Sequence, residues 1–77
     1  MAYIIYGKCT GLIDPETNQP VYHKQFRALN SYGVRVTKLS DAMAYATRED
    51  AQEQLNKPGT KKRIEDGLVQ FEIRKAR

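Results

Sequence analysis

Short stretches of apolar residues, alternating with polar ones or continuous, predict several β-strands along the chain. Residues 3–8 are rich in β-branched and aromatic side chains, which are typical of strands. Tyr3 and Ile5 share one face of this segment, and Ile4 and Tyr6 share the other. Because both faces are apolar, we expect this strand to lie in the centre of a sheet.

The clearest alternation lies near the C-terminus. In residues 68–75, Val69, Phe71 and Ile73 alternate with polar side chains. One face of this predicted strand is therefore expected to be buried, and the other to face solvent. We expect the strand to pair with residues 3–8, because two strongly apolar strands left unpaired would both expose an edge.

The region between these two strands mixes turn signals with alternating patterns. Residues 10–20 contain Gly, Pro, Asn and Asp, which form turns, and predict an exposed loop. Alternation predicts strands at residues 21–29 and 34–38, and a turn at residues 30–33 joins them into a hairpin. The two valines of the second strand are expected to point inward.

The stretch after residue 39 has two interpretations. Ser40 caps a helix over residues 41–56, or residues 43–45 are extended and Thr47 caps a helix over residues 48–56. The second is preferred, because Glu and Asp follow Thr47 where negative charge favours a helix start. In both cases a Lys-Pro-Gly sequence is expected to end the helix.

These elements assemble into one α+β domain over residues 1–77. The predicted fold is a small sheet of three or four mostly antiparallel strands with one helix packed on one face. Polar residues 59–67 are expected to form a loop, with or without one helical turn. The predicted core consists of Ile5, Ala51, Leu55, Val69, Phe71 and Ile73.

Composition adds limits on location and on partners. The net charge of +4 permits an anionic partner but does not require one. The single cysteine, Cys9, excludes an internal disulfide, which small extracellular domains usually need, so we expect a cytoplasmic protein. No stretch approaches the roughly 18 apolar residues of a membrane span, and the N-terminus does not resemble a signal peptide. We therefore expect no membrane contact.

No catalytic or cofactor-binding motif is recognisable. The sequence lacks a glycine-rich phosphate loop, an H-E-x-x-H motif and paired C-x-x-C motifs. His23 is the only histidine, and no nucleophile motif accompanies it. Asp41, Glu49, Asp50 and Glu53 lie close together, but their charge also suits a helix start. We therefore expect a protein that is not an enzyme and that holds no metal or cofactor.

The candidate binding residues are cations and tyrosines. They are Lys57, Lys61, Lys62 and Arg63 in the predicted loop, Arg74, Lys75 and Arg77 at the C-terminal end, and Tyr22 and Tyr32. If both groups of cations are close in space, they form one patch suited to nucleic-acid phosphates, and tyrosines supply stacking surfaces. Tyrosine is also enriched at protein interfaces, and a core this small cannot bury every tyrosine of the chain.

The C-terminal half resembles a pattern of small phage and prophage accessory proteins, in which a short extended segment opens a helix and a final strand follows. The matching residues are Ala42, Tyr45, Thr47, Glu49 and Ala51, followed by Phe71, Glu72, Ile73, Arg74 and Lys75. The resemblance implies a non-enzymatic protein that binds and inhibits or modulates a macromolecular machine, in a mode like that of anti-CRISPR proteins. It carries no binding residues over to this chain.

Three functional hypotheses follow for a monomer or small homo-oligomer, the last being a minor structural subunit or a homodimer formed by an open sheet edge. The first is a binding protein with a macromolecular partner, most simply another protein. The alternative is a nucleic-acid-binding module that uses the basic loop and the basic C-terminus.

Overall fold

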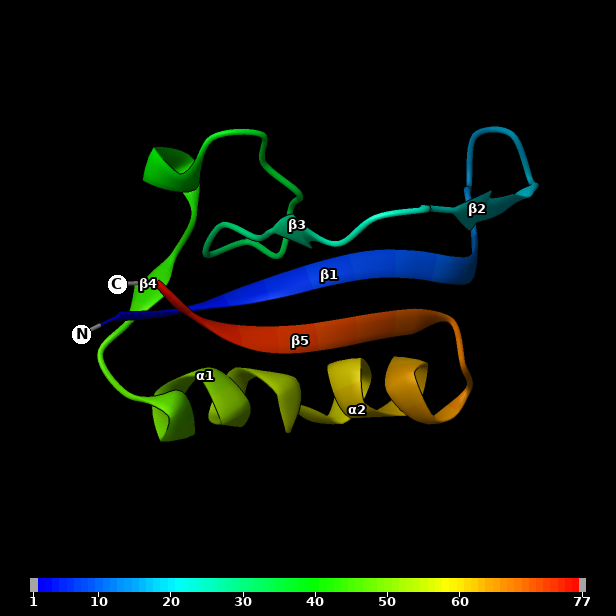
Figure 1. Ribbon diagram of the computed structural model, residues 1–77. Helices are drawn as coiled ribbons and strands as arrows, with labels where there is room; N and C mark the ends of the chain where they lie inside the picture. The colour runs from blue at the N-terminus through cyan, green and yellow to red at the C-terminus, as the bar shows by residue number, and fades with distance from the viewer. Residues whose placement is uncertain (1, 77) are drawn as a thin grey trace.

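Five strands form one antiparallel sheet built around the first strand (Figure 1). The computed structural model describes residues 2–76. Its elements are β1 (Ala2–Ile13), β2 (Pro20–Tyr22), β3 (Arg27–Ala28), the 3-10 helix η1 (Leu39–Asp41), β4 (Ala44–Tyr45), α1 (Arg48–Leu55), α2 (Pro58–Glu65) and β5 (Val69–Ala76). The predicted α+β class with an antiparallel sheet is confirmed, with five strands instead of three or four and two helices instead of one.

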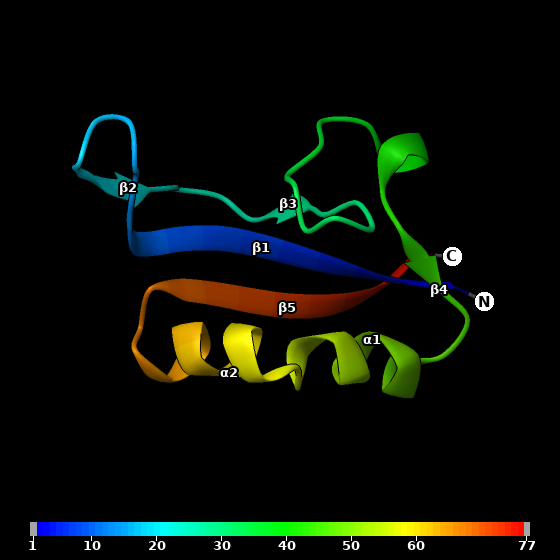
Figure 2. The ribbon, with the colours of Figure 1, turned by 180° about the vertical axis from the view of Figure 1, so that it is seen from behind.

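β1 is the central strand, as its two apolar faces predicted. It pairs with β5 over eight residues, which confirms the predicted pairing of the first and last strands. β4, β3 and β2 follow one another along the other side of β1 (Figures 1 and 2). Ile4 and Ile5 point to opposite faces of the sheet and are both buried.

α1 begins where the preferred interpretation placed it. Thr47 is the N-cap, and its hydroxyl accepts a hydrogen bond from the backbone N–H of Asp50 at 3.1 Å. Immediately before it, Ala44 and Tyr45 are extended and pair with β1. The prediction of a short extended segment followed by a Thr47-capped helix is confirmed.

α2 occupies a segment that was predicted to be a loop, so that prediction is wrong. Pro58 is the first residue of the helix, where its missing N–H is not needed and its fixed φ suits the helix. The lysines and arginine that follow are good helix formers. Gly67, with φ of +72°, lies just beyond the end of α2. The proline therefore marks the start of a second helix as well as the end of the first.

The middle of the chain is less regular than predicted. β1 continues to Ile13, so the loop before β2 is shorter than residues 10–20. The single strand predicted over residues 21–29 is wrong, because residues 23–26 separate β2 from β3. These corrections share one cause: β1 is long enough to pair with two short strands in succession.

The strand predicted over residues 34–38 is also wrong. Arg35 forms only an isolated bridge with Leu29. Val34 is 57% exposed, contrary to its predicted inward orientation. Its backbone N–H donates to the side-chain oxygen of Asn30 at 3.0 Å and not to a neighbouring strand. The Asn30 side chain thus accepts the hydrogen bond that the Val34 N–H would otherwise donate to a neighbouring strand.

The hydrophobic core lies on the side of the sheet where the helices pack. Ile5, Leu29 and Ala51 form its centre, and Ala51 has no exposed surface. The side chains that pack around this centre are Tyr3, Tyr45, Leu55, Phe71 and Ile73. Val69 is buried as well, so all six predicted core residues are confirmed. In both ribbon views the two helices run along β5 (Figures 1 and 2).

Neither helix, nor any other part of residues 2–76, provides an apolar helical segment long enough to cross a membrane.

Candidate functional site

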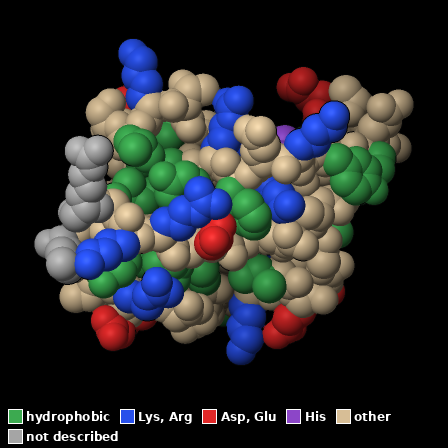
Figure 3. Space-filling view, in the orientation of Figure 1, with side chains coloured by type: hydrophobic (Ala, Val, Ile, Leu, Met, Phe, Trp, Pro, Cys, Tyr) green, Lys and Arg blue, Asp and Glu red, His purple; other side chains and the backbone are tan. Residues whose placement is uncertain are grey.

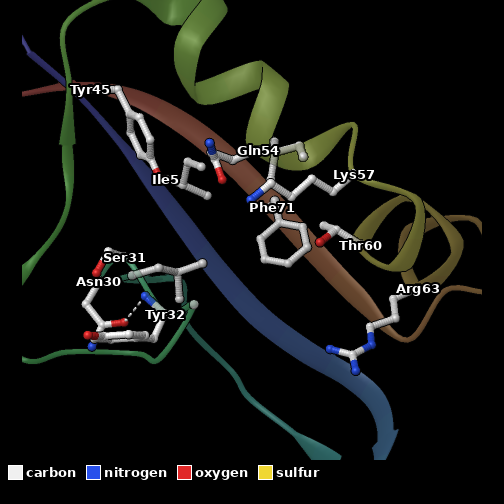
Figure 4. A pocket seen from close by; sticks show the side chains of 13 residues that line it. Ile5, Asn30, Ser31, Tyr32, Tyr45, Gln54, Lys57, Thr60, Arg63 and Phe71 are labelled. Carbon is white, nitrogen blue, oxygen red and sulfur yellow. Dashed lines mark hydrogen bonds between the residues drawn. The ribbon is translucent and has the colours of Figure 1, made fainter.

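A groove of about 260 Å³ lies between the two helices and the turn at residues 30–33 (Figure 4). Its floor is apolar and consists of Ile5, Leu29 and Phe71. The helical wall includes Gln54, Lys57, Thr60 and Arg63, and the facing wall is formed by Asn30, Ser31, Tyr32 and Gly33. The groove therefore combines an apolar base with polar and basic walls.

The floor is shaped by a glycine beneath it. A Cβ on Gly7 would come within 2.9 Å of two ring carbons of Phe71 and within 3.2 Å of Leu29 Cδ1. Contacts this short do not occur without displacement, so the absent side chain is what lets the Phe71 ring lie against β1. The position of the Phe71 ring in the floor depends on this close approach.

Side-chain hydrogen bonds fix the wall opposite the helices. Asn30 Oδ1 accepts from the backbone N–H groups of Tyr32 and Val34 at 2.9 and 3.0 Å. The N–H of Gly33 donates to the carbonyl of Asn30 at 3.0 Å, and Gly33 has φ of +79°. This arrangement confirms the predicted turn. It holds Tyr32 with 89% of its surface exposed beside the groove.

Exposed large hydrophobic side chains are concentrated in the chain segment that begins at that turn. Among residues 2–76, seven large hydrophobic side chains are exposed, and four of them lie between residues 32 and 43. We call these four, Tyr32, Val34, Leu39 and Met43, the apolar segment. A shallow hollow lined by Tyr32 and Met43 adjoins the groove along the turn at residues 30–33. Leu39 instead lines a separate hollow together with Tyr6 and Phe26.

The opposite face of the sheet carries a cluster of cations and aromatic rings. The Arg74 guanidinium lies 4.4 Å from the ring centre of Tyr6, and Lys8 Nζ lies 4.8 Å from that of Phe26. Arg74 also donates to Glu72 Oε2 from Nε and Nη2, at 3.1 and 2.8 Å. Arg74 is thus already engaged within the protein.

The structure places Arg74 apart from the predicted basic residues around α2. Lys57 and Arg63 line the groove, whereas Lys61 and Lys62 are exposed on α2 outside it. Arg74 alternates with Phe71 and Ile73 along β5, so it lies on the other face of the strand. On the side that Figure 3 displays, Lys and Arg side chains lie among hydrophobic ones. The cations of α2 and Arg74 therefore do not form one patch.

The remaining predicted residues lie apart from the groove. Tyr22 is 70% exposed on β2, and Lys75 is exposed near the end of β5. Arg77 lies outside the described residues. Of the predicted binding residues, the groove brings together Lys57, Arg63 and Tyr32.

Three residues of the apolar segment were missed by the sequence. Val34 was assigned to the buried face of a strand, and Leu39 and Met43 were not considered as contact residues. For Val34 and Leu39 a signal was nonetheless present: turn-forming residues 30–33 and 40–41 flank residues 34–39 and disfavour a long strand. Exposed apolar residues between two turns are better explained as a contact loop than as a strand.

His23 is held by hydrogen bonds within the sheet. The ring Nδ1 of His23 accepts a hydrogen bond from the backbone N–H of Cys9 at 2.9 Å. The backbone N–H of His23 donates to the Cys9 carbonyl at 2.9 Å. Burial lowers the pKa of His23 below 6.5, and the nearby cations Arg35 and Arg27 lower it further. The neutral ring thus serves as an acceptor that ties the chain after β2 to β1. Within residues 2–76, no three His, Cys, Asp or Glu side chains are gathered to hold a metal ion.

This linkage predicts a pH dependence of stability. Because the folded-state pKa of His23 lies below the unfolded value of 6.5, the unfolded chain binds the proton more readily. The stabilisation of the folded state by neutral His23 is therefore fully present above about pH 6.5. It is lost as the pH falls through the folded-state pKa. We expect urea unfolding to show a larger loss of stability between pH 7.5 and 5 for the wild type than for His23→Asn. The asparagine side chain keeps an acceptor for the Cys9 N–H but does not titrate. Equal losses of stability in the wild type and in His23→Asn would show that His23 does not cause the pH dependence.

No protein-family model, curated protein or solved structure matches this chain. The resemblance of the C-terminal half to small phage proteins therefore stays a prediction.

Proposed function

We propose that this protein is a non-enzymatic binding protein that recognises another protein through the groove and the adjoining apolar segment. The observation that carries the proposal is that exposed Tyr32 lines a groove with an apolar floor and that exposed Met43 lines the hollow next to it. Contiguous exposed apolar surface marks interaction sites, and tyrosine and methionine are enriched at protein interfaces.

The construction of the turn supports the same function. Tyr32 projects from a turn that three hydrogen bonds hold in place. An aromatic side chain on a fixed backbone loses little conformational freedom on binding, so more of its contact energy contributes to affinity. The polar residues of the groove are amides, hydroxyls and cations, which suit recognition of a partner surface.

Within this proposal the protein acts in the cytoplasm and inhibits or modulates a larger machine by occupying part of its surface. The resemblance to phage accessory proteins and the size of 77 residues support this role. A domain this small exposes much of its surface, so contact is its natural mode of action.

The proposal is tested by site-specific photo-crosslinking in cells that express the protein. A photoreactive amino acid in place of Tyr32 is expected to give a discrete protein adduct, because this position lies at the edge of the proposed interface. The same amino acid at Gln52, which is exposed on α1, serves as the control and is expected to give none. The Tyr32 adduct should disappear in Met43→Ser, because Met43 lines the hollow next to Tyr32. Adducts that are absent at both positions, or equal at both, would overturn the proposal.

A second candidate function rests on the cation and aromatic cluster of the opposite face. Arg74, Tyr6, Phe26 and Lys8 offer guanidinium and ring surfaces of the kind on which unpaired bases stack. Binding of a single-stranded oligonucleotide, with affinity that falls steeply as salt rises and that is lost in Arg74→Ala, would support this candidate.

A further inference from the structure

Positive charge is confined to one wall of the groove. Lys57 and Arg63 belong to the helical side, whereas the facing turn at residues 30–33 is neutral (Figure 4). Neither cation forms an ion pair within residues 2–76, where the sole ion pair joins two side chains of β5. No Asp or Glu of the described chain lines the groove, and the one acidic residue of the adjoining hollow is Asp41, beyond the turn. Both cations therefore remain available to a carboxylate brought by a partner.

The floor offers a place for an apolar side chain next to these cations. Phe71 is only partly buried, and its ring lies against Gly7 with Leu29 beside it. An apolar group seated here would remove the exposed part of the floor from water. The two cations on one wall favour a ligand with a carboxylate, and the apolar floor favours a ligand with an apolar side chain.

The size of the groove indicates a segment of a larger molecule. Its volume of about 260 Å³ lies below the roughly 300–1,000 Å³ that is usual for sites that enclose small ligands. The groove has room for a small number of side chains, and it continues past Tyr32 into a further hollow. An extended peptide fits this shape better than a compact metabolite.

We propose that the groove binds an acidic segment of a partner protein, with an apolar side chain on Leu29 and Phe71 and a neighbouring carboxylate on Lys57 and Arg63. This inference rests on the proposed function and specifies the chemistry of the partner. Nucleic acid would use cations along a longer track and would not need the apolar floor. A second copy of this chain would bring a net charge of +4 to a basic surface, which opposes association.

The inference is tested by selecting peptides from a random dodecapeptide display library against the folded wild-type protein. We expect enrichment of peptides in which Asp or Glu flanks an aromatic or aliphatic residue. The affinity of a selected peptide, measured by fluorescence anisotropy, should fall at least about tenfold in the Lys57→Glu, Arg63→Glu variant, because two charge-assisted contacts become repulsive.

The matched control is Lys61→Glu, Lys62→Glu, which changes the net charge equally at positions on α2 that lie between the tested ones but outside the groove. This control should change the affinity by less than about threefold, since exposed charges at a distance are screened. Circular dichroism of both variants checks that the fold is retained.

Several results would overturn the inference. They are selected peptides without acidic residues, no selection at all, equal losses in the two variants, or displacement of the selected peptide by an oligonucleotide at equal concentration. Self-association that is lost in Lys57→Glu, Arg63→Glu would assign the groove to a second copy. If these results appear while Tyr32 still crosslinks to a protein, the proposed function stands and only the acidic partner is excluded. If acidic peptides bind in the groove but Tyr32 gives no adduct, the proposed cellular function fails.

Discussion

Replacing Ile5 by alanine is expected to lower the free energy of unfolding by about 2–5 kcal/mol. Ile5 is 4% exposed and lies at the centre of the core with Leu29 and Ala51, against Ile73 of the paired strand. Removing three carbons from this position loses their transfer free energy and leaves a cavity under α1. A domain of 77 residues has a margin of only a few kcal/mol, so the variant should be largely unfolded near 37 °C.

The chain provides a matched control on the same strand. Ile13 is 52% exposed at the far end of β1, so Ile13→Ala should change stability by less than about 0.5 kcal/mol. Urea unfolding followed by circular dichroism measures both variants. Similar losses for the two would mean that the core is not where the structure places it.

Two glycine substitutions are expected to change stability in opposite directions. A Cβ at Gly7 would meet the ring of Phe71 at 2.9 Å, so Gly7→Ala must push the ring outward into the groove. Overpacking of this kind costs about 1–3 kcal/mol, offset in part by the reduced freedom of the unfolded chain. We expect a net loss of about 1–2 kcal/mol. The displaced ring should also weaken binding of any peptide that occupies the floor of the groove.

Gly59→Ala is the control for this effect. A Cβ at Gly59 meets no atom within 4 Å, and the residue lies in the first turn of α2. Alanine favours the helix over glycine, so this variant should gain about 0.5–1 kcal/mol. Thermal unfolding of both variants measures the expected loss of stability in Gly7→Ala and the expected gain in Gly59→Ala. A stabilised Gly7→Ala protein would contradict the close approach between β1 and Phe71.

The candidate site was only partly foreseeable from the sequence. Lys57, Arg63 and Tyr32 were named as binding residues, and Ile5 and Phe71 as core residues. The sequence did not show that these two core residues also form the floor of a groove. Whether they do depends on how much of the sheet the helices leave uncovered. The contribution of Asn30 was missed as well, since its role is to hold the turn that carries Tyr32.

The sequence by itself determined the α+β class, the pairing of the first and last strands, the Thr47-capped start of α1 and six residues of the core, but not Leu29 at its centre. These features follow from periodicity and from the chemistry of neighbouring residues, which operate over a few positions in the chain. Only the tertiary structure decided that Lys57 and Arg63 face the turn at residues 30–33, that Arg74 lies on the other side of the sheet, and that Val34 is exposed. The reason is that each of these depends on segments distant in sequence meeting across β1, and no local pattern encodes such a meeting.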